Sequence, residues 1–177
     1  MEKYKRLKRE LKYKGVLVDF YSDQIELPNK NIAEWDYIHH KGAAAILPVD
    51  ENGKIIMVRQ YRNAVEEYTL EIPAGGLNEG EDTKTCATRE VEEEIGYKAE
   101  SVEHLIDFYT TVAFCNEKIG IYYTDKLIPT KQNLDEDEFI NVERYTLEEL
   151  VAKIFSGEIK DGKTVAAILA YKAKMNL

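Results

Sequence analysis

The sequence has 177 residues, of which 44% are hydrophobic and 32% are charged. This composition is typical of a folded globular domain and excludes a disordered polar chain. No segment approaches the roughly 18 apolar residues of a transmembrane helix, and the basic N-terminus leads into no apolar signal core. The formal net charge of −9 disfavours nucleic-acid binding, because an acidic chain repels a phosphate backbone. We expect a cytoplasmic protein with neither a nucleic-acid nor a membrane partner.

The first third of the chain has the alternation and the turn residues of β-structure. Lys14–Phe20 and Gln24–Leu27 are predicted strands on either side of a turn at Tyr21–Asp23, and Glu34–His40 is a candidate third strand. Ala43–Val49 is a continuous apolar run, which is typical of a strand buried on both faces.

A hairpin is expected after this buried strand, because Asn52-Gly53 is a typical two-residue hairpin turn. Its second strand would be Lys54–Gln60. A further short strand is predicted at Tyr68–Ile72.

A change of period indicates a central helix over Asp82–Ile95. This segment is rich in helix formers, contains no proline or glycine, and is followed by Gly96, a typical helix stop. Strands return after it, and two helices follow, one opened by a capping box at Thr146–Glu149 and one capped by Asp161. This order predicts an α+β fold, or a layered α/β/α sandwich around mixed sheets. The strands expected after the central helix are Ser101–Tyr109, Lys118–Asp125 and Phe139–Tyr145.

Glutamates at positions i, i+3 and i+4 of the predicted central helix are Glu90, Glu93 and Glu94. This spacing places them on one face with Cβ atoms about 5–6 Å apart, where like charges destabilise the helix unless they are neutralised. A hard divalent cation such as Mg²⁺ would neutralise them and would be completed by substrate phosphates. Arg89 is placed to orient one carboxylate through a bidentate pair. The alternative is a solvated acidic helix face, which explains most glutamate runs.

That alternative must also explain glycines and an arginine at fixed offsets. The segment Gly75–Tyr97 matches the pattern G-x(5)-E-x(7)-R-E-U-x-E-E-x-G-U, in which U is a bulky apolar or aromatic residue. It resembles the Nudix box, and the chain resembles a Nudix hydrolase. The resemblance implies a Nudix-type sandwich with mixed β-sheets and an N-terminal antiparallel β-region. It also implies hydrolysis of a nucleoside diphosphate linked to another moiety, with Mg²⁺ or Mn²⁺.

The resemblance assigns roles within and beside the box. Glu90 and Glu94 would bind metal together with the backbone carbonyl of Ala74, while Glu93 and Arg89 would assist catalysis. Segments such as LEIPAGGLNEGED and GEIKDGKT extend the similarity to bacterial ADP-ribose pyrophosphatases, which cleave ADP-ribose to AMP and ribose 5-phosphate. The alternatives are another nucleotide sugar such as GDP-mannose, or a non-catalytic ADP-ribose-binding sensor.

Candidate site residues outside the box follow from the same resemblance. Arg62 would bind the substrate phosphates as a planar donor fork, with Arg59 as a weaker neighbour. An ordinary surface arginine at a strand end is the alternative for Arg62. The acidic loop before the last strand would supply Glu136 as the base and Glu138 as a metal ligand, or the two with exchanged roles. By composition alone this loop is a solvated acidic segment.

The N-terminal region, residues 1–40, would contribute dimer contacts to a homodimer, and residues 41–177 would form the Nudix hydrolase domain. Trp35 and Tyr37 share strand parity; Trp35 would stack on adenine or, equally, pack at a dimer interface. Glu117 matches an acid of the family that touches substrate or metal. Val112 stands where the family has a proline near the terminal ribose, so this loop is expected to follow a different path.

Overall fold

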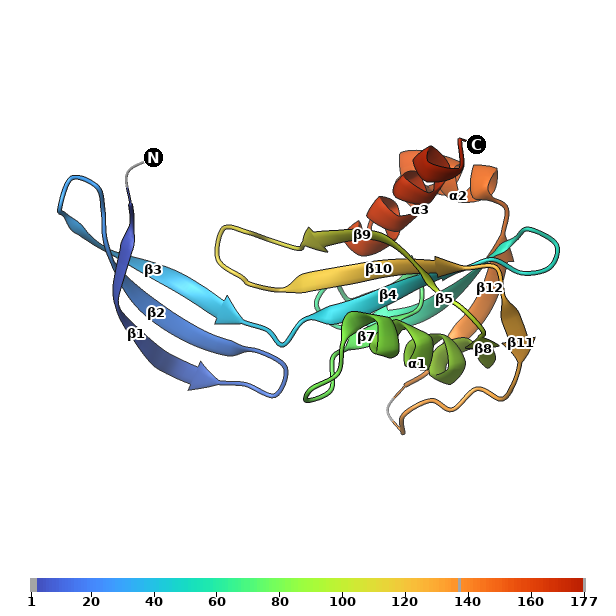
Figure 1. Ribbon diagram of the computed structural model, residues 1–177, viewed down its shortest axis with the longest axis horizontal. Coiled ribbons are helices and arrows are strands. Elements are labelled where there is room, and N and C mark those ends of the chain that lie inside the picture. The colour runs from blue at the N-terminus through green and yellow to red at the C-terminus, as the bar shows by residue number, and fades with distance from the viewer. Residues whose placement is uncertain (1–2, 137, 177) are drawn as a thin grey trace. The chain divides into compact units, whose positions relative to one another are not determined.

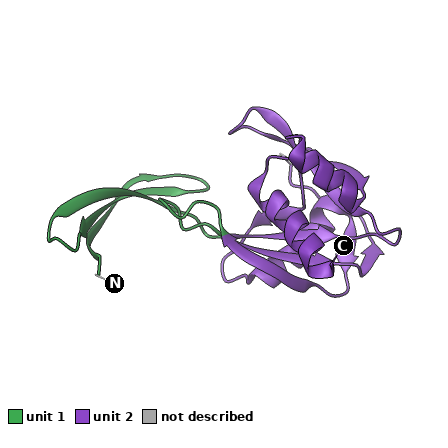
Figure 2. Cartoon of the chain, turned by 90° about the horizontal axis from the view of Figure 1, so that it is seen from above, with its two compact units in different colours: residues 1–42, 109–118 green, residues 43–108, 119–177 purple. Residues whose placement is uncertain are grey.

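The computed structural model describes residues 3–136 and 138–176 and has the α+β architecture that the sequence predicts (Figure 1). The chain forms two compact units (Figure 2). The first contains the described residues up to Gly42 together with Tyr109–Lys118, and the second contains Ala43–Phe108 and the described residues from Ile119 onward. None of the described helices is long and apolar enough to cross a membrane.

The first unit contains an antiparallel sheet of β1 (Lys5–Lys14), β2 (Asp19–Glu26) and β3 (Ile32–His39), in that order. The turn predicted at Tyr21–Asp23 is wrong, because this segment lies inside β2 and the turn is at residues 15–18. A glycine begins that turn, and a Cβ atom there would lie 2.3 Å from the carbonyl oxygen of Val18. The sequence does not reveal β1 because nearly all of its residues are exposed, so the strand has no apolar face.

The central strand of the second unit is β4 (Ala43–Pro48), and all of its residues are buried. It pairs in parallel with β10 (Lys118–Thr124) and antiparallel with β7 (Ala74–Gly76). A strand enclosed in this way has no solvated face, which is why its sequence is continuously apolar rather than alternating. The predicted burial of this strand on both faces is confirmed.

Helices cover both faces of the sheet that contains β4. On one face, Ala44 belongs to an apolar cluster with residues of α1 (Thr83–Ile95). On the other, Leu47 belongs to a cluster with residues of α2 (Leu147–Phe155) and α3 (Gly162–Met175). Figure 1 shows α1 on one side of β4 and β10 and the two C-terminal helices on the other. The second unit is therefore layered as α/β/α.

The expected hairpin of β4 with β5 (Ile55–Arg62) is wrong. A hydrogen-bonded turn at residues 50–53 joins the two strands, but they enter different sheets, and among the described residues one isolated bridge beside the turn links them. Both edges of β4 are already paired with β7 and β10. β5 pairs instead with β6 (Glu67–Glu71) and β12 (Asn141–Tyr145).

The helix ends follow the sequence predictions. α1 begins after Asp82, whose carboxylate accepts a hydrogen bond from the Thr85 N–H (2.9 Å), and it ends at Gly96, where φ is +69°. The capping box of Thr146 and Glu149 opens α2. The placement of α1 fixes which way the acidic side chains of the motif face. The remaining strands are β8 (Tyr97–Ala99), β9 (Glu103–Tyr109) and β11 (Leu127–Pro129).

Candidate active site

The three box glutamates of α1, Glu90, Glu93 and Glu94, do not form a solvated face. Glu90 is 7% exposed and Glu94 is 2% exposed, whereas the side chain of Glu93 is 35% exposed. Charged side chains are almost never buried without a partner or a ligand. Two buried carboxylates on one helix therefore indicate a functional site rather than a solubilising surface.

The box glycine Gly75 makes room for one of these carboxylates. A Cβ atom on Gly75 would lie 2.0 Å from Oε1 of Glu90 and 2.3 Å from its Cδ. β7 therefore approaches α1 closely at a point where any side chain would displace the carboxylate. This contact gives the glycine at the start of the motif a steric explanation.

Gly75→Ala is expected to lower the free energy of unfolding by about 1–3 kcal/mol, because the added methyl group overpacks the contact with Glu90. Gly76→Ala is the matched control, since a Cβ atom there has nothing within 4 Å, and its stability should be close to that of the wild type. Urea unfolding of both variants measures the difference. Equal stability of the two variants would contradict the close approach.

Burial and neighbouring carboxylates disfavour the charged form of Glu94. Its Oε2 accepts a hydrogen bond from the Ala74 N–H (3.0 Å). Burial, together with the charges of Glu90 and Glu138, raises the pKa of Glu94 to about 8. Burial also raises the pKa of Glu90, against the opposing charge of Arg89. Carboxylates that lie close together and are largely shielded from water repel one another, and a hard divalent cation binds such oxygen ligands. The residues present therefore fit Mg²⁺ or Mn²⁺.

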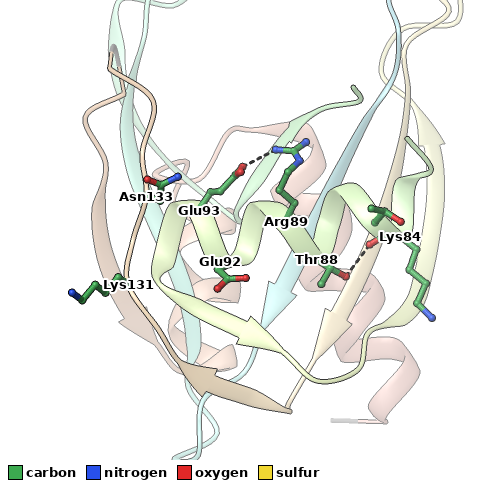
Figure 3. A pocket seen from close by; sticks show the side chains of 8 residues that line it. Lys84, Thr88, Arg89, Glu92, Glu93, Lys131 and Asn133 are labelled. Atoms are coloured by element: carbon green, nitrogen blue, oxygen red, sulfur yellow. Dashed lines mark hydrogen bonds and ion pairs between the residues drawn. The ribbon is translucent and has the colours of Figure 1, made fainter. Parts of the chain in front are cut away.

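Arg89 binds three carboxylates of the motif. Its Nη1 group donates to Oε1 of Glu90 (2.6 Å) and to Oε2 of Glu93 (2.7 Å), and Figure 3 shows the second of these pairs. Its Nε and Nη2 groups form the expected bidentate pair, with Glu81, at 3.0 Å each. The hydrogen bonds to Glu81 contribute most to raising the pKa of Arg89. The guanidinium therefore fixes Glu81, Glu90 and Glu93 in place.

A cleft of about 210 Å³ lies beside the box carboxylates. Glu138 lines it, whereas Glu136 is exposed and is not among the lining residues. Within residues 3–136 and 138–176, no three acidic, histidine or cysteine side chains form a group that could hold a metal ion. The ligand set thus stays a prediction. The lining residues are Gly75, Gly76, Asn78, Arg89, Glu90, Glu93, Asn133, Asp135 and Glu138.

A second, more open cavity of about 610 Å³ lies along the outer face of α1 (Figure 3). It shares Arg89, Glu93 and Asn133 with the acidic cleft and is otherwise lined by exposed polar side chains such as Lys84 and Lys131. The acidic cleft, not this cavity, has Glu90 among its lining residues.

Arg62 is held by a buried carboxylate. Its Nε and Nη2 groups donate to the two oxygens of Glu71 (2.8 and 2.7 Å), and Glu71, 2% exposed, also pairs with Lys163. The charge of Glu94 contributes to raising the pKa of Arg62, after the larger effect of Glu71, so Arg62 lies within electrostatic range of Glu94. The sequence alone does not single out Glu71 and Lys163. Glu71 does carry a detectable signal, because it is an acidic residue between the apolar Leu70 and Ile72.

The remaining predicted site residues are Arg59, Trp35 and Glu117. Arg59 faces the opposite side of β5 from Arg62, by strand alternation, and forms a bidentate pair with Glu143. The structure does not bring it together with the box. Trp35 and Glu117 belong to the first unit. Trp35 is 48% exposed, and the carboxylate of Glu117 accepts a hydrogen bond from the Thr110 hydroxyl (2.8 Å).

Comparison with known proteins identifies the family. Residues 39–168 match the NUDIX domain. An ADP-ribose pyrophosphatase of Bacillus subtilis (strain 168) is 39% identical over 166 residues, and a methanol dehydrogenase activator of Bacillus methanolicus is 41% identical over 167; each alignment covers 93% of this chain and 90% of the relative. A crystal structure of an ADP compounds hydrolase shares the fold, with a TM-score of 0.88 at 21% identity over 99% of this chain and 96% of that one. Nudix hydrolases generally use divalent metal ions. With its box intact, the chain belongs to the Nudix family.

Proposed function

We propose that the protein hydrolyses the pyrophosphate bond of ADP-ribose to AMP and ribose 5-phosphate, with Mg²⁺ or Mn²⁺ as cofactor. The observation that carries this proposal is the pair of buried carboxylates, Glu90 and Glu94, beside an acidic cleft. The similarity to a relative named ADP-ribose pyrophosphatase over 93% of the chain supports the substrate.

In the proposed site, Glu90, Glu94 and the Ala74 carbonyl oxygen would hold the divalent cations. Cations bound there would supply charge neutralisation at the diphosphate and at the leaving phosphate. Glu93 shares the guanidinium of Arg89 with Glu90 and so helps to keep the Glu90 carboxylate in place. Among the described residues, Nη1 of Arg62 makes no hydrogen bond, while Nε and Nη2 are anchored on Glu71. Arg62 therefore has a donor group for a phosphate oxygen.

The acidic loop supplies the group that accepts a proton from the attacking water. The family resemblance gives Glu136 this role and makes Glu138 a ligand, or the reverse. Glu138 lines the cleft, and its charge acts on both Glu90 and Glu94, whereas Glu136 is exposed. The reverse assignment, with Glu138 as the proton acceptor, therefore has the better support, because a base must come within hydrogen-bond reach of its proton.

The second candidate substrate is another nucleotide sugar, such as GDP-mannose. Val112 replaces the proline that the family usually carries near the terminal ribose, and a protein of Yersinia enterocolitica named GDP-mannose pyrophosphatase is 30% identical over 138 residues. A non-catalytic ADP-ribose sensor has less support, because every acid of the box is present.

Residues 1–40 would supply dimer contacts in a homodimer, and Trp35, half exposed on β3, would stack on adenine or pack at that interface. Glu117 would touch substrate or metal. The net charge of −9 favours a small-molecule partner over nucleic acid, and the free cysteines Cys86 and Cys115 fit the reducing cytoplasm.

A substrate panel tests the proposed function. With Mg²⁺, the protein should convert ADP-ribose to AMP and ribose 5-phosphate, and EDTA should abolish this activity until Mg²⁺ or Mn²⁺ is restored. Chromatography of the products from parallel incubations with ADP-ribose and GDP-mannose measures the preference. Cleavage of GDP-mannose with ADP-ribose spared would favour the second substrate. Binding of ADP-ribose with neither compound cleaved would favour the sensor.

A further inference from the structure

The loop that follows β11 lies across the C-terminal end of α1. Carbonyl groups at a helix C-terminus have no partner within the helix, and this loop provides donors for two of them and for the carbonyl of Gly96, which follows the helix. Two of the donors are backbone N–H groups, and the third is a side-chain amide. The hydrogen bonds run from Asn133 N to Glu93 O (2.9 Å), from Gln132 Nε2 to Glu94 O (2.6 Å) and from Thr130 N to Gly96 O (2.8 Å).

The last glycine of the box permits this close approach. Gly96 has φ of +69°, and a Cβ atom there would lie 2.8 Å from the backbone nitrogen of Gln132. Gly96 therefore both ends the helix and leaves space for the loop. The two ends of the motif have parallel functions, because Gly75 admits a carboxylate and Gly96 admits the acidic loop.

The same loop carries acidic side chains into the cleft. Asn133, Asp135 and Glu138 all line it, together with Glu90 of the box. Glu138 is further fixed within the loop, since its N–H donates to the Asp135 carbonyl (3.1 Å). The position of Glu138 over the cleft thus depends on how the loop is attached to α1.

We propose that Gln132 is a positioning residue, whose side-chain amide ties the acidic loop to the backbone of Glu94 and thereby holds Glu138 over the box carboxylates. Of the three hydrogen bonds, this is the one that a side-chain substitution removes. Its acceptor is the backbone of the same residue whose carboxylate is buried beside the cleft. The inference rests on the proposed function, because the position of Glu138 matters for a reaction in this cleft.

Gln132→Met and Gln132→Lys test the proposal. Methionine keeps the length of the side chain without a donor, and we expect kcat to fall by about 10–100-fold, as for other residues that orient active-site groups, with KM little changed. Lysine keeps an N–H donor and suits a helix C-terminus, so it should restore most of kcat. Lys131→Met, one residue earlier in the loop, is the matched control and should behave as the wild type.

Amide hydrogen exchange gives a readout that needs no substrate. The amides of Asn133 and Glu138 should exchange faster in Gln132→Met than in the wild type, and should regain protection in Gln132→Lys. Faster exchange with an unchanged kcat, or no change in either quantity, would overturn the inference. A wild-type protein that cleaves no nucleotide sugar refutes the proposed function itself, whereas an active wild type matched by Gln132→Met refutes only the role of Gln132.

Discussion

Glu94→Gln is expected to lower kcat for ADP-ribose by about 10²–10³-fold, because a cation ligand supplies several kcal/mol of charge stabilisation in the transition state. Glu94 is 2% exposed, and its carboxylate is hydrogen-bonded to the Ala74 N–H. Glutamine has nearly the same shape but no charge, so the fold should be retained. Steady-state kinetics across a range of Mg²⁺ concentrations measure the effect.

Glu92→Gln is the matched control for this substitution. Glu92 lies on the same helix but lines the outer cavity rather than the acidic cleft (Figure 3). Its replacement makes the same carboxylate-to-amide change on α1 and should leave kcat within about twofold of the wild type, since surface substitutions usually have small effects. Full turnover by Glu94→Gln at saturating Mg²⁺ would show that the ligand assignment is wrong.

Glu71→Gln is expected to lower the free energy of unfolding by about 3 kcal/mol at pH 7, the lower end of the range for breaking a buried ion pair. Glu71 is 2% exposed and neutralises Lys163, whose side chain is 10% exposed. Its second partner, Arg62, is 42% exposed and is therefore partly stabilised by water. The loss should come mainly from leaving the buried Lys163 with Asp161 (2.9 Å) as its remaining carboxylate partner.

The pH dependence of this loss identifies its cause. Burial alone would raise the pKa of Glu71, but the pairs with Arg62 and Lys163 outweigh it and lower the pKa to about 2 from 4.5. A lowered pKa contributes stability that is fully present above pH 4.5 and is lost as the pH falls toward 2. The difference in unfolding free energy between the wild type and Glu71→Gln should therefore shrink over this interval.

Glu67→Gln provides the control in the same strand. Glu67 pairs with Lys160 at 3.3 Å, but both side chains are more than half exposed, and exposed pairs contribute about 0–1 kcal/mol. Urea unfolding of both variants at several pH values measures the effects. A loss in Glu71→Gln that stays constant from pH 7 to pH 2 would contradict the electrostatic origin.

The helical part of the fold is largely predictable because its signals are local. Asp82, Gly96 and the Thr146–Glu149 capping box mark helix ends through short-range hydrogen bonds and backbone angles. Strand pairing is not local. The Asn-Gly turn predicts that the chain reverses after β4, but it does not reveal that β7 and β10 already occupy both edges of that strand. A strand such as β1, exposed along nearly its whole length, has no apolar period to detect.

The candidate site, like the fold, is predictable only where its signals are local in the sequence. Helical spacing places the box glutamates on α1, yet their burial depends on β7 and the acidic loop, which pack against α1 from elsewhere in the chain. Sequence similarity selects Arg62, but the Glu71–Lys163 pair that anchors it joins residues 92 positions apart. The choice between Glu136 and Glu138 depends on the path of one loop. A loop has no regular backbone repeat, so its sequence does not predict which way each side chain points.

Binding of Mn²⁺, followed by the loss of its free EPR signal, tests whether the buried carboxylates form a dication site. We expect the wild type to bind Mn²⁺ in competition with Mg²⁺, and Glu94→Gln to bind it at least about tenfold more weakly, as expected when a metal site loses a supporting group. Equal Mn²⁺ affinity in the two proteins, or no binding by the wild type even with ADP-ribose present, would contradict a dication site on α1.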